Sequence, residues 1–301
     1  MKIAFVGTGM IGSGLAANAA MNGCTVAMYY RHDLDQLRER VRRALETFVS
    51  AEAMTKEEAD DYLDGILFSM DMGEVLKDAV MVQESIAEDL EMKREMFRTI
   101  QEIRGNDIII ASSTSAMFPS DLSHGALYPE KIIVGHPYNP SNLLPVIEVC
   151  GPHAPKEVIE KAVNIYREMG KEPVVCLKEN PGFIVNSLSW AVMDGAMEAV
   201  KKGVCSVEDV DKALMYGPGM RMAVTGQLLT MSLGVKGGFR AMNQKYGKTG
   251  DEEKNRLMEM IAEGVDAEIA NRPLEKGNTV EGVEEFRDKA LVELLRLQNK
   301  L

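Results

Sequence analysis

The chain has 301 residues, about twice the length of a typical single domain, so we expect two domains. With 46% hydrophobic and 27% charged residues, its composition is that of a folded globular protein and excludes global disorder. The 46 acidic and 34 basic side chains give a net charge of −12, which argues against nucleic acids and anionic membranes as partners.

Residues 3–30 contain no charged side chain and could be mistaken for an export signal or a membrane span. Glycines at positions 7, 9, 12, 14 and 23 divide this stretch into short pieces, so we expect neither. The chain's cysteines form no C-x-x-C pair, which predicts no disulfide framework and no metal site, and suits reduced thiols in a cytoplasmic protein. They are Cys24, Cys150, Cys176 and Cys205.

Up to residue 179, short β-branched runs alternate with helical patterns. This alternation predicts an α/β domain, with a mostly parallel sheet covered by helices on both faces. The expected strands are residues 3–6, 25–29, 79–82, 107–110, 132–134, 146–149 and 174–177.

A stretch rich in arginine and glutamate, residues 33–64, interrupts the expected strand order. It has the pattern of two helices, and Thr55 and Glu58 have capping-box spacing at the start of the second. We interpret it as a solvated helical hairpin inserted into the sheet domain, and a lid over a substrate is the alternative.

After residue 180 the strand signals disappear, which predicts an all-helical second domain over residues 180–301 and a first domain over 1–179. Asn180 as N-cap and Pro181 at the first helical position predict a helix up to residue 203. Ser206 followed by Asp209 predicts the next helix, and residues 250–272 and 279–298 again have helical spacing.

The run Gly7-Thr8-Gly9-Met10-Ile11-Gly12 matches the dinucleotide fingerprint G-x-G-x-x-G. An expected strand precedes it, and a helix with a small apolar face follows. Glycines at these places allow the tight turn, the close approach of pyrophosphate and the packing of helix against strand. We therefore predict a Rossmann-type domain in which Gly7, Gly9, Met10, Ile11 and Gly12 hold a dinucleotide.

The second expected strand ends in Tyr30-Arg31-His32, where NAD-binding domains usually have a carboxylate for the ribose hydroxyls. An arginine there suits a 2′-phosphate, and the neutral Tyr30 does not repel it. We therefore predict NADP(H) as the cofactor. The alternative is NAD, with Asp33 reaching the ribose and Arg31 pointing to solvent.

Further motifs follow the expected strands: Ser112-Ser113-Thr114-Ser115, Gly135-His136-Pro137-Tyr138-Asn139-Pro140, Glu148, and Pro181-Gly182-Phe183-Ile184-Val185-Asn186. With the glycine fingerprint, they give the chain a resemblance to the two-domain 3-hydroxyacyl-CoA dehydrogenase family over nearly its whole length.

The resemblance implies a role for each of several residues. Ser115 would hold the substrate oxygen, His136 would be the catalytic base, Glu148 would orient it, and Asn186 would lie near the reacting centre. Asn139 would contact the substrate, and Glu88 and Lys93 would contact the cofactor. It also implies S stereochemistry, a homodimer formed through the helical domain and, for acyl-CoA substrates, a place in fatty acid metabolism.

These residues make chemical sense by themselves. Oxidising a secondary alcohol needs a base for the hydroxyl proton, and a neutral imidazole suits that task. Glu148 lies within an apolar strand, where an unpaired carboxylate would be costly, so a pairing with His136 is expected. Ser115 and Asn186 can donate hydrogen bonds to a developing oxyanion.

The run Gly217-Pro218-Gly219-Met220-Arg221-Met222-Ala223 and the pair His136-Pro137 resemble the branch that contains lambda-crystallin, L-gulonate 3-dehydrogenase and L-carnitine dehydrogenase. That branch implies a small free 3-hydroxy acid as substrate, and Arg221 is our candidate clamp for its carboxylate. A structural salt bridge is the other interpretation of Arg221.

Two alternatives stay open at this point. The substrate could be a CoA thioester whose phosphates meet the arginines of the hairpin, Arg38, Arg40, Arg42 and Arg43, although such clusters more often form a solvated face. The chain could also be a non-catalytic cofactor-binding protein, against which the intact set of catalytic candidates argues.

Overall fold

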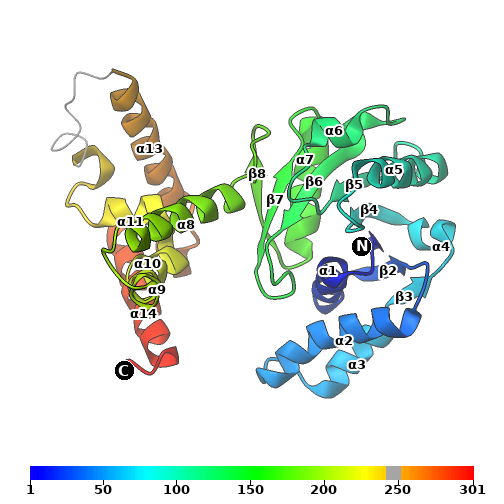
Figure 1. Cartoon of the computed structure of the whole chain (residues 1–301), viewed down its shortest axis with the longest axis horizontal. Coiled ribbons are helices and arrows are strands. Elements are labelled where there is room, and N and C mark those ends of the chain that lie inside the picture. The colour runs from blue at the N-terminus through cyan, green and yellow to red at the C-terminus, as the bar shows by residue number, and fades with distance from the viewer. Residues whose placement is uncertain (242–251) are drawn as a thin grey trace. The chain divides into compact units, whose positions relative to one another are not determined.

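The computed structural model describes residues 1–241 and 252–301. They form two compact units, Met1–Ala191 and Val192–Leu301, which divide inside helix α8 (Val185–Lys201) (Figure 1). None of the described helices is long and apolar enough to cross a membrane.

The first unit is built on an eight-stranded sheet with the order β3-β2-β1-β4-β5-β6-β7-β8. All of its strand pairs are parallel except β6 with β7. The Rossmann-type α/β fold is thereby confirmed. The strands are β1 (Lys2–Val6), β2 (Thr25–Tyr29), β3 (Leu67–Ser69), β4 (Ala79–Glu84), β5 (Ile109–Ser112), β6 (Ile132–Pro137), β7 (Val146–Cys150) and β8 (Glu172–Cys176).

Helices cover both faces of this sheet, because successive side chains of each strand point to opposite faces. In β1, Ile3 and Phe5 join one apolar cluster, while Ala4 and Val6 join the other. The first cluster includes buried residues of α1, α2 and α7, and the second includes buried residues of α4, α5 and α6. The helices are α1 (Met10–Met21), α2 (Leu34–Ser50), α3 (Lys56–Asp64), α4 (Met72–Leu76), α5 (Leu90–Arg104), α6 (Pro119–Ser123) and α7 (Lys156–Glu168).

All seven expected strands are present, but the sequence patterns missed β3. This strand has three half-buried residues and forms one edge of the sheet beside β2. Three residues are too few to show an alternation of apolar and polar side chains, so only the pairing with β2 identifies this strand.

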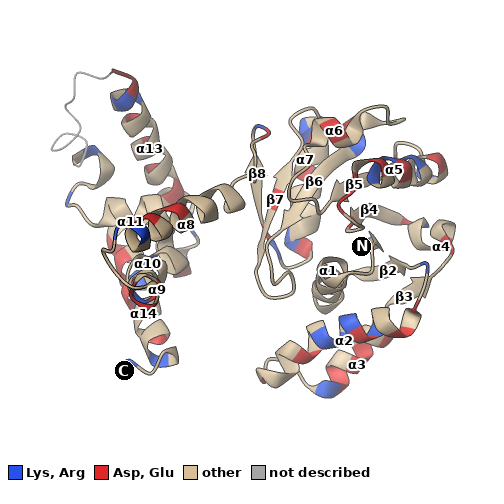
Figure 2. Ribbon diagram, viewed as in Figure 1, with Lys and Arg blue, Asp and Glu red and all other residues tan. Residues whose placement is uncertain are grey.

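The charge-rich stretch forms the expected hairpin, α2 and α3, with Asp33 as N-cap of the first helix and the Thr55–Glu58 capping box on the second. Figure 2 shows positively and negatively charged residues mixed along both helices. Arg38 pairs with Asp64 at 2.6 Å, and Arg42 pairs with Asp60 at 3.0 Å. These pairs favour the solvated-face interpretation over a phosphate-binding patch.

The second unit is helical in its described residues, as expected. Its core contains Leu229, Phe239, Val265, Ile269 and Val283. Part of the expected start of the third helix, residues 250–251, lies outside the described residues. The helices are α9 (Val207–Tyr216), α10 (Pro218–Thr225), α11 (Gln227–Leu233), α13 (Glu252–Asn271) and α14 (Val280–Leu297).

The expected helix after Asn180 begins later than predicted. Gly182 and Phe183 have positive φ values of 71° and 51°, which no α-helix accommodates, so α8 starts at Val185. The Asn180 side chain donates to the carbonyls of Pro181 and Phe183 in this turn and does not cap α8.

Candidate active site

The glycine loop between β1 and α1 has the close contacts that the fingerprint requires. A Cβ on Gly7, which has φ 116°, would lie 2.3 Å from the Ser85 carbonyl oxygen, and one on Gly12 would lie 2.4 Å from the Gly7 carbonyl oxygen. A Cβ on Gly9 would instead project into open space. The backbone at Gly9 can therefore be approached closely at the N-terminus of α1, which is the arrangement that binds a pyrophosphate.

A cleft of about 620 Å³ lies along this loop and continues past the end of β2. Tyr30, Arg31 and Asp33 line it together with Gly7 and Gly9. The carboxylate of Asp33 accepts the Gln36 backbone N–H at 2.9 Å and so caps α2. Arg31 is exposed and has no carboxylate partner among residues 1–241 and 252–301.

Arg40 is a contact of this loop that the sequence patterns did not single out. Its guanidinium donates to the Thr8 carbonyl oxygen at 2.7 Å and also to Gln36, which lines the cleft. Of the four hairpin arginines, Arg40 is therefore the one that connects the hairpin to the glycine loop. Its position in a charge-rich run concealed this role.

His136 and Glu148 face each other across the antiparallel pair of β6 and β7. The His136 Nδ1 atom lies 2.6 Å from Glu148 Oε2, and both side chains are buried. The Phe183 ring lies against the imidazole, with 5.5 Å between ring centroids. An ionised carboxylate can only accept, so Nδ1 carries the hydrogen and Nε2 has the free lone pair.

Glu148 is also held by backbone donors at the start of α8. Its Oε1 accepts the N–H groups of Ile184 at 2.6 Å and Val185 at 2.8 Å. Burial alone would raise the pKa of Glu148, but the hydrogen bonds from His136, Val185 and Ile184 outweigh it and hold that pKa below its ordinary value. The carboxylate therefore stays ionised beside the imidazole. Sequence reasoning missed these donors, because backbone groups have no residue-type signature.

The other catalytic and substrate candidates lie in different surroundings. Ser115 is exposed in the loop after β5, at the sheet edge where β6 ends with His136 and Pro137. Asn186 is half-buried in the first turn of α8, directly after the residues that hold Glu148. Asn139 is exposed after β6. Arg221 is exposed on α10, which belongs to the second unit.

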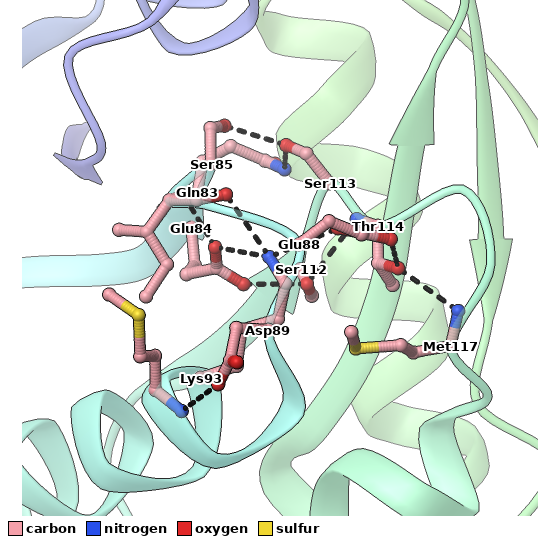
Figure 3. Close-up of polar contacts among 12 residues, drawn as sticks. Gln83, Glu84, Ser85, Glu88, Asp89, Lys93, Ser112, Ser113, Thr114 and Met117 are labelled. Atoms are coloured by element: carbon pink, nitrogen blue, oxygen red, sulfur yellow. Dashed lines mark hydrogen bonds and ion pairs between the residues drawn. The ribbon is translucent and has the colours of Figure 1, made fainter.

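A buried polar cluster lies between β4, β5 and α5 (Figure 3). The Lys93 ammonium is 1% exposed and donates to Glu84 Oε1 at 2.7 Å. Glu84 also accepts the Ile86 backbone N–H at 2.6 Å and the Ser112 hydroxyl at 2.6 Å. Lys93, expected to touch the cofactor, is thus enclosed within the protein. Glu84 and Ser112 are site residues that sequence reasoning missed.

Glu88, the other residue expected at the cofactor, connects this cluster to the loop that carries Ser115. Its Oε2 lies 3.5 Å from Lys93 Nζ, and its Oε1 accepts from the Thr114 hydroxyl (Figure 3). The same Oε1 also accepts from the Ser115 backbone N–H. Buried Lys93 therefore orients Glu88, and Glu88 in turn orients the Ser115 backbone.

Comparisons with known proteins agree with this geometry. The NAD binding domain of 3-hydroxyacyl-CoA dehydrogenase matches residues 2–180, and the C-terminal domain of the same enzyme matches residues 182–273. The chain belongs to the 3-hydroxyacyl-CoA dehydrogenase family. The resemblance inferred from the motifs is confirmed.

Some similar proteins of the 3-hydroxyacyl-CoA dehydrogenase family are named for a free hydroxy acid, and others are named for an acyl-CoA substrate. An L-carnitine dehydrogenase of Oceanobacillus iheyensis is 33% identical, covering 98% of this chain and 97% of the relative. A 3-hydroxyacyl-CoA dehydrogenase of Gibberella moniliformis is 32% identical, covering 82% of this chain and 77% of the relative. The crystal structure of a 3-hydroxyacyl-CoA dehydrogenase from Archaeoglobus fulgidus is 25% identical over the whole of both chains, with a TM-score of 0.69.

Membership in the 3-hydroxyacyl-CoA dehydrogenase family makes this chain an oxidoreductase that uses a nicotinamide cofactor. The glycine loop fits that cofactor, since it leaves open the space at Gly9 while packing closely at Gly7 and Gly12. No cluster of three or more potential metal ligands occurs in residues 1–241 and 252–301.

Proposed function

We propose that this enzyme oxidises a small (S)-3-hydroxy acid reversibly to the 3-keto acid, with NADP as cofactor and His136 as the base. The observation that carries the proposal is the buried His136–Glu148 pair, fixed by the backbone amides of Ile184 and Val185 at the start of α8, in the same unit as the glycine cradle.

The chain's own groups account for the proton. Glu148 holds the hydrogen on Nδ1, so Nε2 of His136 can accept the hydroxyl proton of the substrate. The resulting imidazolium is stabilised by the adjacent carboxylate, and in the reductive direction it returns the proton to the carbonyl oxygen. A nicotinamide cofactor held at the glycine loop would supply the hydride acceptor for C3 of the substrate. Ser115 and Asn186 donate to the substrate oxygen, and Asn139 contacts the substrate near the end of β6.

The surroundings of β2 support NADP over NAD. Asp33, the carboxylate that would favour NAD, is engaged as the N-cap of α2, while the guanidinium of Arg31 lines the cleft. A 2′-phosphate there gains a charge-assisted bidentate contact. Glu88 would contact the cofactor directly, and Lys93 would act by holding Glu88.

Replacing Arg31 tests the cofactor preference. We expect Arg31→Ala to lower kcat/KM for NADP by roughly tenfold or more, the loss of one charge-assisted contact, and to change the value for NAD less than about twofold. Arg43→Ala is the matched control, because Arg43 pairs with Glu39 on the same hairpin and does not line the cleft. An unchanged NADP constant in Arg31→Ala would contradict the assignment.

A free acid is the favoured substrate. The relative from Oceanobacillus iheyensis is named for L-carnitine, a free 3-hydroxy acid, and is similar over nearly the whole chain. Arg221 is the proposed clamp for the substrate carboxylate. The alternative is an (S)-3-hydroxyacyl-CoA, as the name of the Gibberella relative indicates. Against it, Arg38, Arg42 and Arg43 are already paired with carboxylates.

A substrate panel decides between these proposals. Small free 3-hydroxy acids, L-carnitine among them, and 3-hydroxybutyryl-CoA are assayed with both cofactors by absorbance at the nicotinamide band. We expect turnover of a free acid with a higher kcat/KM than the CoA ester, and a raised KM for that acid in Arg221→Ala. Better turnover of the CoA ester would support the alternative, and cofactor binding without turnover of any 3-hydroxy compound would refute both.

A further inference from the structure

Two of the chain's cysteines lie directly opposite each other at the edge of the sheet. Cys150, the last residue of β7, is in register with Cys176, the last residue of β8. Both belong to the same buried apolar cluster, and Cys176 retains 6% of its surface exposed. Directly paired residues on parallel strands point to the same face, so the two thiols are neighbours.

We propose that Cys150 and Cys176 form a reversible modification site, a dithiol that hydroperoxides oxidise to a disulfide and that dithiol reductants restore. None of the steps proposed for hydride transfer uses either sulfur.

The spacing of the strands permits the bond but leaves it strained. The Cα atoms of such partners lie about 4.8 Å apart, within the range of about 4.4–6.8 Å found for disulfides. Their Cβ atoms keep roughly the strand spacing, which exceeds the ~3.8 Å of a relaxed disulfide. The bond would therefore draw β8 toward β7, and a strained disulfide is readily reduced. Because β8 is the edge strand of the sheet, it pairs with β7 alone and can move.

The two sulfurs differ in acidity. The neighbouring Cys176 sulfur, together with burial, raises the pKa of Cys150, which stays a thiol. The Cys150 thiol lowers the pKa of Cys176 against the opposing effects of burial and Glu148, and the Ile184 backbone N–H adds to the lowering. The thiolate is the attacking species in thiol oxidation, so Cys176, the more exposed of the two, would react first.

The chemistry balances with a hydroperoxide as the oxidant. The Cys176 thiolate attacks the peroxide oxygen, the O–O bond breaks, and with one proton the products are a sulfenic acid and water when the oxidant is hydrogen peroxide. The Cys150 sulfur then displaces the sulfenic oxygen as a second water, and the S–S bond forms. Two thiols lose two electrons and two protons, and one peroxide becomes two waters.

Oxidation at this site would reach the catalytic pair through one backbone amide. Ile184, whose N–H lies 2.6 Å from Glu148 Oε1, directly follows Phe183, and Phe183 belongs to the same buried cluster as Cys150 and Cys176. Drawing β8 toward β7 shifts the packing around Phe183 and with it that amide, and Glu148 then holds His136 less firmly. This consequence rests on the proposed function, whereas the modification itself does not.

The first experiment maps the disulfide without measuring activity. Reduced full-length protein is treated with hydrogen peroxide, its free thiols are alkylated, and its peptides are analysed by mass spectrometry with and without reductant. We expect a reductant-sensitive link between the peptides of Cys150 and Cys176. The double variant Cys24→Ser/Cys205→Ser keeps the link and is the matched control. Retention of both thiols, or links to Cys24 or Cys205 instead, would overturn the site.

A single cysteine variant tests the order of the oxidation steps. Cys150→Ala removes the second sulfur, so a sulfenic acid trapped at Cys176 by a dione reagent supports the order of steps, and none trapped there contradicts it. If that variant fails to fold, the wild-type map alone decides whether the disulfide forms.

The second experiment measures the link to Glu148. We expect the oxidised wild type to lose at least about fivefold in kcat, and reductant to restore it, while Cys176→Ala loses less than twofold on the same treatment. A mapped disulfide with unchanged kcat would overturn the link while leaving the site. Absence of any dehydrogenase activity in the reduced protein would refute the proposed function and leave the disulfide map valid.

Discussion

The Glu148 side chain makes hydrogen bonds to several separate parts of the candidate site. It is 1% exposed, and its oxygens receive an imidazole and two amides from separate segments of the chain. A buried carboxylate with this many donors is ionised and fixed in place. The ring that it faces is therefore held in one tautomer and one orientation.

Removing the charge of Glu148 should impair proton transfer more than binding. In Glu148→Gln the amide oxygen can accept from Ile184 and Val185, but its NH₂ group then faces Nδ1 of His136. The ring hydrogen moves to Nε2, which can no longer accept the substrate proton. We expect kcat to fall by roughly 100-fold or more, with KM changed little. Glu179→Gln, which removes another carboxylate of the same unit, bonded to Ser120, should leave kcat within about twofold. An equal loss in both variants would contradict this role.

The same carboxylate should make stability depend on pH. Its pKa in the folded chain lies below the ordinary 4.5, so between these two values the unfolded chain binds a proton that the folded chain does not. Stability therefore rises with pH through this window and is lost as pH falls through it. We expect the Tm difference between wild type and Glu148→Gln to shrink as pH is lowered from 6 to below 4, as followed by circular dichroism. A difference that does not vary with pH would contradict the assignment.

Among the elements, the sheet could be predicted from sequence and its exceptions could not. Seven strands were recognised because each contains a short apolar run with β-branched residues, and the His136–Glu148 pair followed from their places on consecutive strands. The short edge strand β3 and the delayed start of α8 depend on tertiary context. The positive φ values of Gly182 and Phe183 prevent the helix start that Asn180 and Pro181 predict, and no residue pattern indicated these φ values.

Much of the candidate site could be predicted from the sequence because its chemistry needs particular residue types at strand ends. The residues that hold these side chains and loops in place could not be predicted. Glu84 and Ser112 lie inside strands, where their burial could have meant simple packing, and Arg40 was one arginine among several. Such residues are identified only by the partners that the fold brings to them.

The connection between β6 and β7, residues 138–145, carries Asn139 and is fastened by polar contacts to other elements. Asn18 of α1 donates to the Asn142 carbonyl at 2.9 Å, and Asn142 donates to the Ala44 carbonyl of α2 at 3.2 Å. Buried Lys171 donates to two carbonyls of the same connection, Ser141 and Leu144. The loop that follows His136 is therefore held in place by contacts from α1, α2 and Lys171.

The contribution of Lys171 to the stability of the folded chain should depend on pH. Burial lowers the pKa of Lys171 to about 8, so between about 8 and the ordinary 10.5 the folded chain has released a proton that the unfolded chain keeps. Stability from this residue therefore rises with pH in that window. We expect Lys171→Met to be less stable by about 1–3 kcal/mol at pH 7, since a buried carbonyl and a half-buried one lose their donor. Urea unfolding should show a wider gap at pH 9.5. Lys178→Met, at an exposed lysine, is the control, and a gap that narrows at high pH would contradict the assignment.

At the scale of the whole molecule, helices α8 and α9 expose several apolar side chains. Neither α8 nor α9 has a buried residue in the single chain. Met197 on α8 is 62% exposed and Val207 on α9 is 65% exposed. Exposed apolar helix faces of this kind are typical of subunit interfaces, and a second copy of the same chain is the simplest partner.

We therefore predict a homodimer formed through these helices. The wild type should sediment at twice its 33.2 kDa mass at micromolar concentration. In the variant Met197→Glu/Val207→Glu a charge enters the desolvated contact without a partner, which should weaken association by at least about 100-fold and give monomers. Met70→Glu is the matched control, because Met70 is 60% exposed but lies in the first unit, so its dimer should persist. A monomeric wild type would refute the dimer, and a double variant that still dimerises would place the interface elsewhere.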